Sequence, residues 1–244
     1  MNESTLEKMN QMKFYGMKNS LQNLVETNQH QRLTNDEFIS MLIQAEWEDR
    51  ENRRINRYLK AARFRYRASV EEINFEKHRN LDKTQLLRLC ECHFIGKGEN
   101  LLITGPTGVG KSFIASAIGH QACMKGYRVL YFNIQKLFPQ LRMLKADGSY
   151  LKQVNKIAKQ DLLILDDFGL QPLDAQSRMM LLELIEDRHG KKSTIISSQI
   201  PVAKWYDIIG ESTIADAILD RMVHTAHRLN MKGQSLRKIT QNNE

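Results

Sequence analysis

The sequence predicts an α/β protein in which a parallel sheet is covered by helices on both faces and is preceded by a small all-α domain. Two observations support the sheet. From about residue 99 onward, apolar runs of strand length alternate with helical runs, and a glycine-rich loop separates the first such strand from the first helix. That alternation is typical of parallel sheets. A third observation supports the helical domain, since residues 1 to about 95 contain no proline and have helical patterns throughout.

Residues 1–70 are expected to form the helical domain. Thr34 and Glu37 have the spacing of a capping box, so a long amphipathic helix is predicted to begin there. The apolar residues from Met12 to Val25 also have helical spacing and indicate a shorter helix that packs on the long one. The N-terminal domain is therefore predicted to be a pair of packed helices.

The remaining chain divides into a linker, a second domain and a tail. A helix from Leu81 to Cys92 is expected within a linker over residues 71–98, and the polar tail at 241–244 is expected to be disordered. Residues 99–240 form the predicted α/β domain, whose strands and helices alternate in chain order: Leu101 to Thr104, Phe113 to Met124, Arg128 to Phe132, Ile134 to Leu144, Leu162 to Leu165, Gln176 to Asp187, and Ser193 to Ser197.

Composition narrows the class of protein further. Of the 244 residues, 41% are hydrophobic and 26% charged, and no apolar stretch approaches the length of a membrane span. The N-terminus lacks the pattern of a secretory signal, so a cytoplasmic location is expected. Cys90-Glu91-Cys92-His93 has no second Cys/His pair nearby, which favours packing over a zinc site. The net charge of +8 indicates a polyanionic partner such as nucleic acid; the alternative is that surface lysines only keep the protein soluble.

A phosphate-binding motif provides the clearest functional signal. Gly105 to Ser112 reads G-P-T-G-V-G-K-S between a strand and a helix, where a structural turn would not need a lysine followed by a hydroxyl. Lys111 is predicted to reach the phosphates of ATP, and Ser112 to hold Mg²⁺. The predicted nucleotide-binding residues are Gly105, Pro106, Thr107, Gly108, Val109, Gly110, Lys111, Ser112 and Phe113.

Two adjacent carboxylates follow a later buried strand. Asp166 and Asp167 end the run L-L-I-L-D-D, and the carboxyl ends of parallel strands meet at the ligand site. Asp166 is predicted to bind Mg²⁺, whereas Asp167 is expected to point elsewhere and to polarise the attacking water. The structural alternative is that both carboxylates cap a turn.

Three later residues are candidates for sensing the nucleotide. Ser198 follows another strand and either orients the attacking water or only caps the loop before Pro201. Arg221 lies on a predicted helix and either acts as an arginine finger across a subunit boundary or pairs with neighbouring acids. Arg237 is a further cation that either senses the γ-phosphate or has no catalytic role.

Taken in order, G-P-T-G-V-G-K-S, L-L-I-L-D-D-F-G, S-S-Q, A-D-A-I-L-D-R-M and G-Q-S-L-R resemble the AAA+ ATPases of the DnaC-type helicase-loader clade. More narrowly, nearly the whole chain is similar to the IstB-like insertion-sequence ATP-binding proteins. The resemblance implies a five-stranded parallel core, ATP hydrolysis with Mg²⁺, and ATP-dependent homo-oligomers with the active site at the subunit interface. By position it assigns Lys111, Asp166, Asp167, Ser198 and Arg221 to catalysis.

A basic stretch near the end of the long predicted helix is the candidate DNA-binding surface. Between residues 50 and 67, Glu51 is the only acid, and aromatic residues are interleaved with the cations. Binding is expected to be largely independent of DNA sequence, because no base-reading pattern is present. The alternative is a solvated helix face balanced by upstream acids. The predicted DNA-binding residues are Arg50, Arg53, Arg54, Arg57, Lys60 and Arg63.

These observations favour an ATPase that assembles on double-stranded DNA and recruits or stimulates the transposase of the same insertion sequence, with hydrolysis controlling disassembly. The function belongs to DNA recombination. A replicative helicase loader would have the same ATPase motifs and is the main alternative. A small-molecule kinase would be expected to have an arginine-rich lid after the second strand, where this sequence has an apolar helical pattern instead. A passive DNA-binding module would not need Lys111, Ser112 and Asp166.

Overall fold

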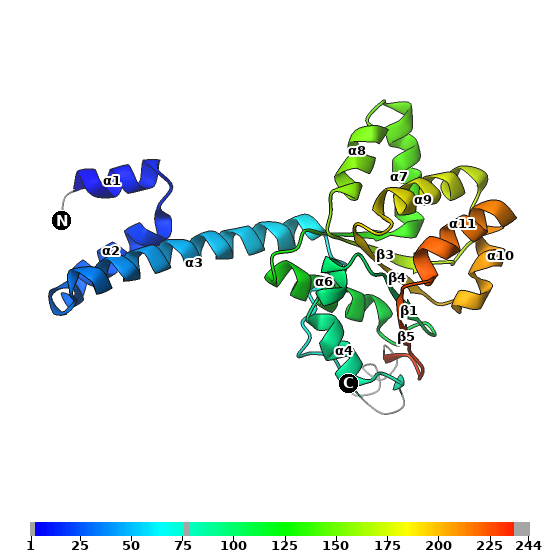
Figure 1. Cartoon of the computed structure of the whole chain (residues 1–244), viewed down its shortest axis with the longest axis horizontal. Helices are drawn as coiled ribbons and strands as arrows, with labels where there is room; N and C mark the ends of the chain where they lie inside the picture. The colour runs from blue at the N-terminus through cyan, green and yellow to red at the C-terminus, as the bar shows by residue number, and fades with distance from the viewer. Residues whose placement is uncertain (1–2, 76–78, 237–244) are drawn as a thin grey trace, which may run out of the picture. The chain divides into compact units, whose positions relative to one another are not determined.

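The computed structural model describes residues 3–75 and 79–236 (Figure 1). Its contacts divide the chain into two compact units, residues 1–57 and 58–244. The expected domain boundary at residue 70 and the linker over residues 71–98 stay predictions. The expected disorder of residues 241–244 and the sensing role considered for Arg237 lie outside the described residues.

The N-terminal unit is helical, as predicted. It contains α1 (Glu3–Gln11), α2 (Tyr15–Glu26), a short 3-10 helix (Gln29–Arg32) and the start of α3 (Asn35–Ala62). The capping box is confirmed, because Glu37 Oε2 accepts from the Thr34 backbone N–H and hydroxyl at 2.8 Å each. At Gly16, α2 approaches α3 so closely that a Cβ would lie 2.3 Å from the Ala45 carbonyl oxygen. The predicted packing of the shorter helix on the long one is therefore confirmed.

The second unit is built on a five-stranded parallel sheet with the strand order β2-β3-β4-β1-β5 (Figure 1). The predicted parallel α/β fold is confirmed. The strands are β1 (Leu101–Thr104), β2 (Val129–Asn133), β3 (Leu162–Phe168), β4 (Ser193–Ser198) and β5 (His227–Asn230).

Helices cover both faces of this sheet, which explains why its central strands are continuous apolar runs. Along β1, Leu101 and Ile103 belong to one core and Leu102 to the other. The first core lies beneath α4 (Lys83–Cys90), α5 (His93–Gly96) and α6 (Lys111–Met124). The second lies beneath α7 (Ile134–Ala146), α8 (Tyr150–Ala158), α9 (Ala175–Arg188), α10 (Trp205–Ile209) and α11 (Ser212–Val223).

Two parts of this unit differ from expectation. The chain is not helical up to residue 95, because α3 ends at Ala62 and the described residues from 63 to 82 are mostly irregular. In this segment Phe64 and Tyr66 both pack on the first core, so side chains two residues apart contact the same surface. The strand β5 was not predicted, because only Leu229 is buried on it and an edge strand needs no apolar run. Among the described residues, no helix is both long and apolar enough to cross a bilayer.

Candidate nucleotide site

The motif of residues 105–112 forms the loop after β1 and the start of α6, as predicted. Gly110 precedes α6 with a φ of 93°, a left-handed conformation that favours glycine. No side chain of the described residues caps this helix at Gly110. The first backbone N–H groups of α6 are therefore suited to bind an anion, which the helix dipole also favours.

Lys111 is buried within the same loop. Its Nζ donates to the carbonyl oxygens of Gly105 and Pro106, both at 2.8 Å. Both acceptors are uncharged carbonyl oxygens of the same loop, and they hold the ammonium group in place. The loop thus combines backbone N–H groups with a fixed cation, which is the arrangement that a polyphosphate requires.

Asp166 and Asp167 lie at an irregularity near the end of β3. The pairing of β3 with β4 shifts between Leu165 and Phe168, and Asp167 has a φ of 61°. Adjacent side chains of a regular strand point to opposite faces, so Asp167 was expected to point away from Asp166. That expectation is wrong. Arg65 Nη1 lies 3.5 Å from Asp166 Oδ2 and 3.0 Å from Asp167 Oδ2, so both carboxylates meet one guanidinium.

Asp166 is fully buried and is surrounded by hydroxyl donors. Its Oδ1 accepts from Ser112 Oγ at 2.9 Å and from Ser197 Oγ, and its Oδ2 accepts from the Tyr131 hydroxyl. Burial and the hydrogen bond to Asp166 raise the pKa of Tyr131, so this hydroxyl remains a donor. These hydrogen bonds compensate for the desolvation of a carboxylate inside the protein.

The pair formed by Ser112 and Asp166 fits Mg²⁺. A hydroxyl and a carboxylate oxygen 2.9 Å apart are hard ligands, and magnesium in nucleotide sites is held by few protein oxygens together with phosphate and water. The described residues contain no cluster of three or more His, Cys, Asp or Glu side chains that could hold a metal. A magnesium ion here would therefore depend on the nucleotide for its other ligands.

A pocket of about 370 Å³ lies beside the loop, within the size range of small-ligand sites. Lys111, Ser112 and Asp167 all line it, so the structure brings these three predicted residues together. Several lining residues were not predicted to be there: Arg65, Tyr66, Leu170, Gln199 and Leu236.

Polar residues near this pocket show what the sequence reasoning missed. Asn133 Nδ2 donates to Asp167 Oδ2 at 2.7 Å, and Thr107 Oγ1 donates to Gln199 Oε1 at 2.5 Å. Asn133 ends β2, as Asp166 and Asp167 lie near the end of β3. Polar residues at the carboxyl ends of parallel strands meet at the ligand site, and this rule predicts Asn133 as well as the two carboxylates.

Ser198 lies at the end of β4 with its side chain buried. Its hydroxyl donates to the Phe168 carbonyl at 2.8 Å and accepts from the Ile200 N–H at 3.0 Å. These contacts fit the loop-capping alternative, and the sensing role of Ser198 stays a prediction.

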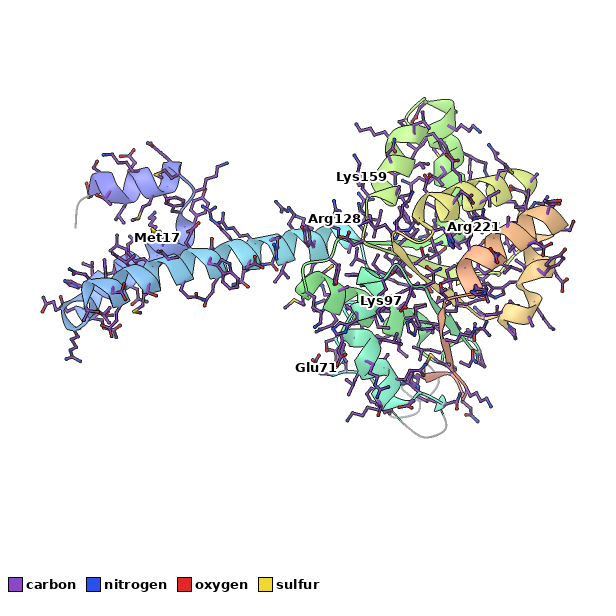
Figure 2. The ribbon with its side chains drawn as sticks, in the orientation of Figure 1. Met17, Glu71, Lys97, Arg128, Lys159 and Arg221 are labelled. Carbon is purple, nitrogen blue, oxygen red and sulfur yellow. The ribbon has the colours of Figure 1, made fainter. Side chains whose placement is uncertain are left out.

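Arg221 lies on α11 (Figure 2) and pairs with Glu186 of α9, Nε to Oε2 at 2.6 Å. Both residues line a separate pocket of about 550 Å³ with Lys145 and Tyr150. In the part of the chain that the structure describes, Arg221 does not line the pocket beside Lys111. Its finger role thus requires a second subunit and stays a prediction.

Three arginines among the predicted DNA-binding residues form ion pairs with acidic side chains. Arg50 pairs with Glu46, Arg53 with Asp49 and Arg54 with Glu51, each at 2.6 Å. These arginine side chains are nonetheless about half exposed. Lys60 also lies on α3, whereas Arg63 follows its end with a φ of 57°. DNA binding by Arg50, Arg53, Arg54, Arg57, Lys60 and Arg63 stays a prediction.

Solved structures share this fold. The DnaC helicase loader matches with a TM-score of 0.54 and 24% identity over 72% of this chain and 99% of that one. The replication initiator DnaA, bound to AMPPCP and single-stranded DNA, matches with a TM-score of 0.60 and 16% identity over 74% of this chain and 55% of that one. The fold and the loop after β1 thus define a P-loop protein with an AAA+ core.

Sequence relatives give the family. The model of the IstB-like ATP binding protein family matches residues 7–244, and the chain belongs to this family. It is 42% identical to a putative insertion sequence ATP-binding protein of Sinorhizobium fredii over 96% of both chains. It is also 30% identical to the putative ATP-binding protein of insertion sequence IS21 from Pseudomonas aeruginosa, over 94% of this chain and 86% of the relative. The chain is thus an ATP-binding protein of the insertion-sequence type, as the resemblance implied.

Proposed function

We propose that this chain is an ATPase that assembles with ATP on target DNA and recruits or stimulates the transposase of the same insertion sequence. The site geometry supports this proposal, because the loop, the buried Lys111 and the Ser112–Asp166 pair at 2.9 Å are suited to bind a triphosphate. The relatives are named both for ATP binding and for insertion sequences, which supports a role in transposition.

In this proposal, ATP hydrolysis depends on where charged groups lie around the γ-phosphate. Ser112 and Asp166 would hold Mg²⁺, which neutralises charge on the β- and γ-phosphates. Lys111 stabilises the charge that develops on the transferred group, and Asp167 polarises the attacking water. Ser198 orients that water, while Arg221 completes the site from a neighbouring subunit. Each role places a group near the γ-phosphate, because phosphoryl transfer depends mainly on position and electrostatics.

ATP acts as the switch of assembly in this proposal. A nucleotide shared between two subunits binds the assembled state more tightly than the separate subunits, and so favours assembly. Hydrolysis removes this difference in nucleotide affinity between the assembled and the separate subunits, and the subunits then dissociate. The protein would thereby remain on double-stranded DNA only for as long as ATP persists.

Electron microscopy with duplex DNA tests the whole proposal. The wild-type protein with ATP should form particles on DNA that then retain the transposase. Lys111→Ala should form none, because the fixed cation of the phosphate site is lost. Lys97→Ala removes an exposed lysine elsewhere (Figure 2) and should behave as wild type. Normal assembly by Lys111→Ala would refute the phosphate site, and particles that bind a replicative helicase but no transposase would indicate a helicase loader.

The DNA-binding part of the proposal predicts a change in salt dependence. Charge reversal at Arg53 and Arg57 should flatten the slope of log affinity against log salt by about one unit for each DNA phosphate that the variant no longer binds. Fluorescence anisotropy with a labelled duplex measures this slope. Charge reversal at Lys152 and Lys159 makes the same change in net charge on or next to α8, and it should leave the slope unchanged. An equal effect of both double variants would mean that only net charge matters.

A further inference from the structure

Arg65 belongs to the basic stretch of the sequence, yet the structure places it in the nucleotide pocket. Its neighbours explain how. A Cβ at Gly119 of α6 would lie 2.6 Å from the Phe64 ring, so Phe64 packs closely on that helix. The Tyr66 ring lies 6.2 Å from that of Phe113, also on α6. The two flanking rings thus anchor the segment to the helix that follows the phosphate loop.

The guanidinium of Arg65 contacts both carboxylates of the site. Its Nη1 lies 3.0 Å from Asp167 Oδ2 and 3.5 Å from Asp166 Oδ2, and its side chain is 38% exposed. Burial lowers the pKa of Arg65, but attraction to Tyr66, Tyr131 and Asp167 outweighs this effect and raises it above its ordinary value. The group is therefore charged at every physiological pH.

The position of the Arg65 guanidinium conflicts with the site that fits Mg²⁺. Ser112 and Asp166 are the protein oxygens that fit Mg²⁺, and Arg65 approaches Asp166 from within the same pocket. Two cations that share one carboxylate repel each other, and the repulsion is strongest where solvent is partly excluded.

We propose that Arg65 is a nucleotide-site residue that competes with Mg²⁺ for Asp166. This inference rests on the proposed function, since it requires ATP and magnesium in this pocket.

The test measures how much Mg²⁺ tightens nucleotide binding. The affinity of the full-length protein for fluorescent mant-ATP is determined in EDTA and in saturating Mg²⁺, and the ratio of the two dissociation constants gives the tightening factor. In Arg65→Gln this factor should rise roughly three- to tenfold, because the competing charge is gone and a part-exposed ion pair is only moderately strong. Arg65→Lys retains the charge and should stay close to wild type.

Arg67→Gln is the matched control, since Arg67 is exposed and lies two residues further along. Its tightening factor should equal that of wild type. An unchanged factor in Arg65→Gln would overturn the competition, as would an equal rise in Arg67→Gln. If Arg65→Gln does not fold, a rise in Arg65→Lys as large as that expected for Arg65→Gln would also overturn it, because charge would then not be the cause. Failure of the wild type to bind mant-ATP would refute the proposed function itself.

Discussion

Replacement of Asp167 by Asn is expected to stop ATP turnover while preserving the fold. Asp167 has a φ of 61°, a conformation that Asn tolerates better than most residues with a side chain. Its Oδ2 accepts from Asn133 at 2.7 Å and from Arg65 at 3.0 Å, and the amide oxygen of Asn can accept from both. The fold therefore loses only the charge of a part-exposed ion pair, about 0.5 kcal/mol.

The rate should fall much further than the stability. A group that polarises the attacking water contributes roughly 10²- to 10⁴-fold, and an amide cannot accept the proton. Phosphate release in the presence of duplex DNA measures turnover, and mant-ATP fluorescence measures binding. We expect Asp167→Asn to bind ATP nearly as wild type does, because Lys111 and the phosphate loop are unchanged.

Asp167→Ala provides the comparison that separates chemistry from folding. Alanine in a left-handed conformation costs about 1 kcal/mol more than Asn, and it leaves Asn133 without its acceptor. Both variants should be inactive, but only the alanine variant should unfold at a clearly lower temperature. Hydrolysis by Asp167→Asn at the wild-type rate would remove Asp167 from the mechanism.

Two further predictions concern stability. Asp161 accepts from Arg128 and Lys192; burial raises the pKa of Asp161, but these hydrogen bonds outweigh burial and hold it below the ordinary value. A lowered carboxyl pKa stabilises the fold above the ordinary pKa and ceases to do so as pH falls through the folded value. Asp161→Asn should therefore lower the free energy of unfolding by about 1–2 kcal/mol at neutral pH and by much less below about pH 3. Urea unfolding measures this free energy at both pH values. An equal decrease at both would contradict this reasoning. Gly119→Ala places a Cβ 2.6 Å from an aromatic carbon and 2.7 Å from an aliphatic one, so it should lower the melting temperature. The overpacking cost of about 1–3 kcal/mol exceeds the gain in helix propensity of about 1 kcal/mol. Gly96→Ala, with its nearest atom at 3.9 Å, should not lower it.

The sequence predicted those parts of the fold that local chemistry determines. The buried strands are continuous apolar runs, and the capping box at Thr34 fixes the start of α3, so both follow from a few neighbouring residues. The irregular segment after Ala62 and the edge strand β5 were not predicted, because long-range packing stabilises them. Phe64 and Tyr66 did contain a signal, since side chains two residues apart indicate an extended segment. The basic residues around them favoured a helical interpretation instead.

The candidate site likewise contains one part that the sequence predicts and one part that it does not. Its phosphate loop is one contiguous motif, so the sequence predicts the placement of Lys111 and Ser112 in a common pocket. The contact of Arg65 with Asp167 spans 102 positions, and no local pattern indicates it. Moreover, it depends on the irregularity in β3, which brings two adjacent carboxylates to one side against the alternation of a regular strand. A regular β3 would direct Asp166 and Asp167 to opposite faces, and Arg65 could then contact at most one of them. The backbone conformation at Asp167 is therefore the feature on which the shared contact of Arg65 with both carboxylates depends.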